Sequence, residues 1–206
     1  MNEQRRQGAL SLLIALVQGL VLLLLHQAIE FDFWPDQHPH WLFTFYSFAL
    51  VTPTLFLLAY QPERMAGYVK RIIGFGALCA LLGFYVGYQA TPLEYISYDR
   101  VLAPFVLTMI LASLLGIVYL EASAEGESFQ FSWLFARAWR HALTLGFALL
   151  FVLLSWGVLM LWGALFDAIG IEFFIDLFTE RWFFYPILGL LNGIGIVLFR
   201  RQFRII

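Results

Sequence analysis

Long runs of apolar residues dominate the chain, and short polar segments separate them. A helix needs about 20 mainly apolar residues to cross a bilayer, since it rises about 1.5 Å per residue. The runs that approach or exceed this length are 8–26, 41–60, 72–88, 101–120, 142–166 and 182–199. None of them contains Asp, Glu, Lys or Arg, and none alternates like a membrane β-strand. The pattern predicts an all-α fold: a bundle of six transmembrane helices in three hairpins, forming a single transmembrane domain over 1–206.

Basic residues are distributed unevenly between the polar segments. If the N-terminus is cytoplasmic, the outer segments hold only Arg100 and Arg181. The inner segments then hold Arg5, Arg6, Arg64, Lys70, Arg71, Arg137, Arg140, Arg200, Arg201 and Arg204. Because Lys and Arg accumulate on the cytoplasmic side, we expect both termini to lie in the cytoplasm. The first run lacks a small-x-small cleavage site, so we expect it to be an uncleaved anchor.

Composition supports a membrane protein and narrows its chemistry. Apolar residues make up 62% of the chain and charged residues 13%, about half the share in soluble domains. A water-soluble domain of this size could not cover so apolar a core with so few charges. The single cysteine, Cys79, excludes an intrachain disulfide and a multi-cysteine metal site. Basic residues are few and sit beside the apolar runs, so nothing indicates nucleic-acid binding.

Two polar segments have the pattern of interfacial helices, which lie along a membrane surface. In the 129–141 segment, Phe131, Phe135 and Trp139 recur every fourth residue, and Arg137 and Arg140 supply positive charge. The alternative is that the fifth membrane segment simply starts early. In the 170–181 segment, a stripe of acidic residues opposes an apolar face; these are Glu172, Asp176 and Glu180. The stripe is typical of a solvated face, and the alternative is a docking surface for a cation or a basic partner.

The outer segment that begins at Asp32 holds the candidate metal ligands. Asp36, His38 and His40 lie close together in the sequence, and imidazole nitrogens with carboxylate oxygens suit Zn²⁺. The alternative is an ordered loop with Trp34 and Trp41 at the membrane interface. No catalytic motif or cofactor-binding motif is present, so we expect no cofactor and no catalytic residue.

Polar residues inside the apolar runs can either pack between helices or line a path for a solute. Gln18 and Asn192 are the main ones, and Asn192 lies in a glycine-rich stretch from Gly189 to Gly195. Gly83 and Gly87 form another GxxxG spacing, which lets helix backbones approach closely. The runs contain no acidic residue, Lys or Arg, which argues against an ion-coupled pump.

Most of the chain resembles a known family, and the fifth and sixth apolar runs carry the clearest features, together with Phe131, Trp133 and Arg137 in the segment before them. The matching features are Trp156 and Trp162, then LFDAIGIEFFIDLF, then Phe183 and the glycine-rich segment ending at Arg200. They are similar to the domain of unknown function 4153 family of bacterial inner-membrane proteins. That resemblance implies a multi-pass protein of the inner membrane and supplies no catalytic residues. Members of this family are generally longer, so the resemblance implies a short member or the N-terminal half.

These observations leave three classes of function open. The leading hypothesis is a non-catalytic inner-membrane protein that acts through a lipid or a membrane protein partner, which includes a homo-oligomer. The second is a transporter or channel for a small neutral or hydrophobic solute, with Gln18 and Asn192 along its path. The third is an envelope enzyme that uses a metal at Asp36, His38 and His40. The absence of catalytic motifs favours a protein that is not an enzyme.

Overall fold

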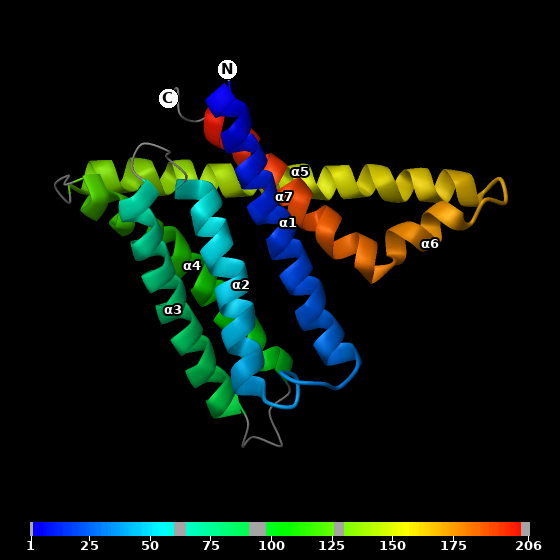
Figure 1. Ribbon diagram of the computed structural model, residues 1–206, viewed down its shortest axis with the longest axis horizontal. Helices are drawn as coiled ribbons and strands as arrows, with labels where there is room; N and C mark the ends of the chain where they lie inside the picture. Colours follow the sequence, from blue (N-terminus) through cyan, green and yellow to red (C-terminus); the bar gives the residue numbers. More distant parts are fainter. Residues whose placement is uncertain (1, 60–64, 91–97, 126–129, 203–206) are drawn as a thin grey trace. The chain divides into compact units, whose positions relative to one another are not determined.

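The computed structural model describes residues 2–59, 65–90, 98–125 and 130–202 (Figure 1). Within these ranges the chain forms helices and no strand, which confirms the all-α prediction. The helices are α1 (Asn2–Glu30), α2 (Pro39–Ala59), α3 (Met65–Ala90), α4 (Tyr98–Glu125), α5 (Phe131–Asp167), α6 (Phe173–Thr179) and α7 (Arg181–Gln202). All except α6 are long enough to cross a bilayer.

Six segments of the described chain have the length and apolar composition of membrane spans. They are Gly8–Glu30, Pro39–Ala59, Gly67–Gln89, Pro104–Ala124, Phe131–Asp167 and Arg181–Arg200. Each contains one of the predicted runs or most of it, so the six-helix prediction is confirmed. Many of their large apolar side chains are exposed, among them Leu81, Leu115 and Leu153. Exposed apolar surface of this extent is stable only in lipid, and the protein is an integral membrane protein.

The helices extend beyond the predicted apolar runs. In α3, for example, the helix includes Lys70 and Arg71, which precede the run at 72–88. A helix that continues past the hydrocarbon region keeps its backbone groups hydrogen-bonded, and long basic side chains reach toward the headgroups. The predicted ends at Tyr60 and Phe129 lie outside the described residues, as do Arg64, Glu94 and Arg204.

The chain divides into two compact units. One consists of Met1–Leu23 with Leu143–Ile206, and the other of Leu24–Ala142. The first unit contains most of α1, the larger part of α5, and α6 and α7. The second contains α2, α3, α4 and the first turns of α5. The single domain expected over 1–206 stays a prediction.

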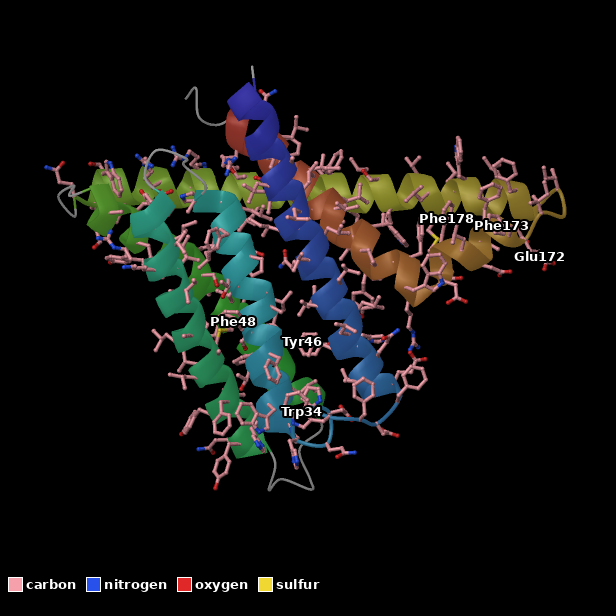
Figure 2. The ribbon with its side chains drawn as sticks, in the orientation of Figure 1. Trp34, Tyr46, Phe48, Glu172, Phe173 and Phe178 are labelled. Atoms are coloured by element: carbon pink, nitrogen blue, oxygen red, sulfur yellow. The ribbon has the colours of Figure 1, made fainter. Side chains whose placement is uncertain are left out.

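In the unit Leu24–Ala142, α2 and α3 run side by side in close contact (Figure 1). A methyl group added at Gly83 would lie 2.7 Å from the carbonyl oxygen of Phe43, and one at Gly87 would lie 2.5 Å from the Cα atom of His40. Figure 2 shows Phe48 on the side of α2 that faces α3. The predicted GxxxG pair therefore lies in a helix–helix interface, where the missing side chains let the two backbones approach.

Two hydroxyl groups on α2 are satisfied within their own helix. The hydroxyl of Thr44 donates to the carbonyl of His40 at 2.6 Å, and the hydroxyl of Ser47 donates to the carbonyl of Phe43 at 2.6 Å. Both bonds reach back four residues, which removes the cost of placing a hydroxyl in an apolar environment. The α2–α3 interface therefore includes hydroxyl groups, since methyl groups added at Gly76 and Gly83 would meet the side chains of Thr52 and Ser47.

In the other unit, small residues line the interface of α1 and α7. A methyl group added at Gly19 would lie 2.5 Å from the carbonyl oxygen of Tyr185, and one at Gly189 would lie 2.6 Å from that of Ala15. Gly193 faces Ala15 in the same way. As residue numbers rise along α1, those of the facing residues fall along α7, so the helices are antiparallel (Figure 1). This arrangement places the start of α1 beside the end of α7.

The helix α5 is a continuous element of 37 residues. At 1.5 Å per residue it is roughly 55 Å long, well beyond the roughly 30 Å hydrocarbon core. The interfacial helix predicted over 129–141 is helical from Phe131, but it continues without a break into the fifth membrane segment. The alternative of an early start describes this continuity, and α5 is drawn as one unbroken helix in Figure 1. The predicted 170–181 helix is the short α6.

The close contact at Gly83 gives a direct test of the α2–α3 interface. We expect Gly83→Ala to lower the free energy of unfolding by about 1–3 kcal/mol, because the new methyl group meets backbone atoms of α2. Gly74→Ala is the matched control on the same helix, since nothing lies within 4 Å of the position its methyl group would occupy. Denaturant unfolding of both variants in mild detergent measures the difference. Equal stability of the two variants would contradict the interface.

Candidate functional site

A buried carboxylate lies near the end of α4. The predicted fourth apolar run ended at Leu120, but α4 continues to Glu125 and carries Glu121 on its buried face. The side chain of Glu121 is 1% exposed. An ionised carboxylate buried to this degree needs charged or hydrogen-bonding partners, because removal from water costs several kcal/mol. Its surroundings are therefore the first place to look for a functional site.

Three basic side chains of α5 converge on one oxygen of Glu121. Nη1 of Arg137 donates a hydrogen bond to Oε2 at 3.2 Å. Nε2 of His141 lies 3.1 Å from the same oxygen, and Nη2 of Arg140 lies 3.7 Å from it. The Arg137 contact is a hydrogen bond, the Arg140 contact is a looser charge contact, and Nε2 of His141 lies close to the oxygen without hydrogen-bond geometry. We call Glu121, Arg137, Arg140 and His141 the Glu121 cluster.

The helical repeat of α5 places the three basic residues together. Residues three and four apart share a helix face, so Arg137 lies beside Arg140 and His141 on the side toward α4. Trp133, one turn earlier, lies under Arg137, with the guanidinium carbon 4.8 Å from the ring centroid. A cation over an indole ring is stabilised by the negative face of the ring. The aromatic ring thus holds Arg137 in the position that contacts Glu121.

The two ends of the cluster differ in their access to solvent. His141 is 4% exposed and is buried with Glu121, whereas the side chains of Arg137 and Arg140 are 22% and 30% exposed. The cluster thus joins a buried carboxylate–imidazole pair to two guanidinium groups at the surface. Such an arrangement fixes α4 against the first turns of α5.

The opposite face of the same part of α5 is apolar and exposed. Phe131, Phe135 and Trp139 are 81%, 58% and 59% exposed. Their rings stack in sequence, with centroids 5.9 Å and 6.4 Å apart. We call these three residues the aromatic ladder. The sequence predicted that they share a face, and the structure shows that this face points away from α4.

The sequence placed Glu121 in an inner loop and therefore missed the cluster. The apolar run ends one residue earlier, and a charged residue at that position is typical of a loop entry. The available signal was the spacing of Arg137, Arg140 and His141, which predicts one cationic helix face. Only the packing of α4 on α5 shows that this face meets a carboxylate.

The segment before α2 brings the two predicted histidine ligands near each other. The ring centroids of His38 and His40 are 5.6 Å apart, and His40 also packs against Phe84, with centroids 5.0 Å apart. In the described part of the chain, no group of three or more His, Cys, Asp and Glu side chains could hold a metal ion. Asp36 is thus not gathered with His38 and His40 into such a group, and the metal site stays a prediction.

Trp34 and Trp41 form an aromatic cluster beside these histidines. Trp34 packs edge-on against Phe45 at a centroid distance of 5.4 Å, and Trp41 stacks on Phe45 at 6.1 Å. Figure 2 shows Trp34 at the end of α2, in the loop that precedes it. Aromatic rings gathered at a helix end are typical of a membrane interface, as the alternative interpretation of this loop expected.

Gln18 and Asn192 each adjoin the α1–α7 interface. Gln18 is 5% exposed and precedes Gly19, while Asn192 is half-buried and precedes Gly193. Both glycines contact the facing helix closely. These positions favour a role in helix packing, and their function as path-lining residues stays a prediction.

The acidic residues predicted on 170–181 lie at the surface. Glu172, Asp176 and Glu180 are all exposed, as the interpretation of a solvated face expected, and Phe178 on α6 is buried. Gly163 of α5 lies against Ile175 and Phe178 of α6. Figure 2 shows Glu172 pointing outward beside the loop between α5 and α6.

Comparison with known proteins yields no match. No protein family, no curated protein and no solved structure is detectably similar to this chain. The assignment as an integral membrane protein therefore depends on the six spans. Any more specific function has to be argued from the Glu121 cluster and its surroundings.

The convergence of charges on Glu121 predicts a large effect of its removal. We expect Glu121→Gln to lower the free energy of unfolding by roughly 3 kcal/mol, because removing one member of a buried ion pair leaves the other charges uncompensated. The value is at the lower end for buried pairs because both guanidinium groups retain contact with solvent. Glu172→Gln, at an exposed carboxylate, is the control. Denaturant unfolding in detergent checks both variants, and equal small effects would show that the cluster does not stabilise the fold.

Proposed function

We propose that this protein is a non-catalytic, multi-pass protein of the bacterial inner membrane that acts by binding a lipid or a membrane protein partner. The binding surface is the end of the α4–α5 hairpin that carries the Glu121 cluster and the aromatic ladder. The observation that supports this proposal is the combination, on one helix, of a buried ion-paired cluster with partly buried arginines and exposed aromatic rings.

The buried side chains of the Glu121 cluster are held in place by several contacts. Glu121 is contacted by Arg137, Arg140 and His141, and Arg137 is also held by Trp133. A carboxylate shared in this way is a poor general base, because proton uptake would weaken several charge contacts at once. The cluster is therefore better suited to holding a surface in place than to catalysis.

The exposed part of the same helix has the composition of a binding surface. Aromatic residues and arginine are the side chains most enriched at interfaces, since they offer large apolar area and several hydrogen-bond donors. The first turns of α5 present both kinds, with the aromatic ladder on one face and the guanidinium groups on the other. A lipid surface or a membrane protein can engage these groups without chemical change.

The distribution of basic residues supports an orientation with this end in the cytoplasm. Arg137 and Arg140 belong to the same set of segments as Lys70 and Arg71, in agreement with the positive-inside rule. The antiparallel pairing of α1 and α7 agrees with termini on the same side of the membrane. The resemblance to the domain of unknown function 4153 family supports the inner membrane as the location, and membership of that family is part of this proposal.

Thiol labelling tests the proposed orientation. In a Cys79→Ser background, we expect a membrane-impermeant maleimide to label Gln37→Cys, but not Gln202→Cys, in right-side-out vesicles. Both positions are exposed, and they lie on opposite sides in the proposed topology. Detergent permeabilisation should make Gln202→Cys reactive and serves as the control. The reverse pattern would invert the topology and place the Glu121 cluster outside.

Native mass spectrometry in a mild detergent tests the proposed mode of action. We expect the wild-type protein to retain a lipid or a protein partner, because its binding surface combines charge with exposed aromatic rings. The triple variant Phe131→Ala, Phe135→Ala, Trp139→Ala should lose the retained species. The matched control is Leu149→Ala, Leu153→Ala, Leu161→Ala, which removes exposed apolar residues from the later turns of the same helix. Solute flux by the purified protein in vesicles would instead favour the transporter hypothesis.

A further inference from the structure

We draw no further inference here: the strongest candidate, the pair of imidazole rings of His38 and His40 beside Phe84 at the start of α2, supplies only two possible ligands for a metal ion, and the described residues place no third His, Cys, Asp or Glu side chain with them.

Discussion

Burial of the Glu121 carboxylate determines how the first turns of α5 pack on the end of α4. A charge removed from water is stable only beside opposite charges and hydrogen-bond donors, and Arg137 and Arg140 provide them from the face of α5 that also carries His141. That requirement fixes the rotation of the first turns of α5 about their own axis. Once the basic face is turned toward α4, the aromatic ladder has to point away from it.

The remaining helix contacts follow a different rule, since lipid supplies no hydrophobic force to press membrane helices together. Close packing takes its place, and it needs residues small enough to let backbones meet. Gly83 provides this on α3, and Gly19 and Gly189 provide it between α1 and α7. The two kinds of contact have separate roles: glycine interfaces assemble the spans, and one charge cluster orients the helix that reaches beyond them.

The length of α5 lets one helix carry both a membrane span and a segment outside the hydrocarbon core. The 37 residues of α5 exceed what a hydrocarbon core can hold, so part of the helix has to lie outside it. The extra length carries Trp133, Arg137 and Trp139, which combine an affinity for headgroups with an affinity for acyl chains.

The sequence alone determined the class of this protein and much of its local structure. Six apolar runs without charges can only be stable as helices in lipid, because an unpaired backbone group in hydrocarbon costs several kcal/mol. The repeat of Phe131, Phe135 and Trp139 predicted one aromatic face, and the GxxxG spacing of Gly83 and Gly87 predicted a close helix contact. These features depend on residues near one another in the chain, where the helical repeat fixes their relative positions.

Only the tertiary structure decided which surfaces meet. Glu121 and His141 are twenty residues apart, and no local pattern predicts that Oε2 and Nε2 lie 3.1 Å from each other. The structure likewise showed that α5 is continuous from Phe131 to Asp167 and that Gly19 faces Tyr185. Contacts of this kind depend on the rotation and register of whole helices, which are set by the sum of packing and charge interactions between them. The local sequence fixes the side chains on each helix face, and the packed structure selects the partner that each face contacts.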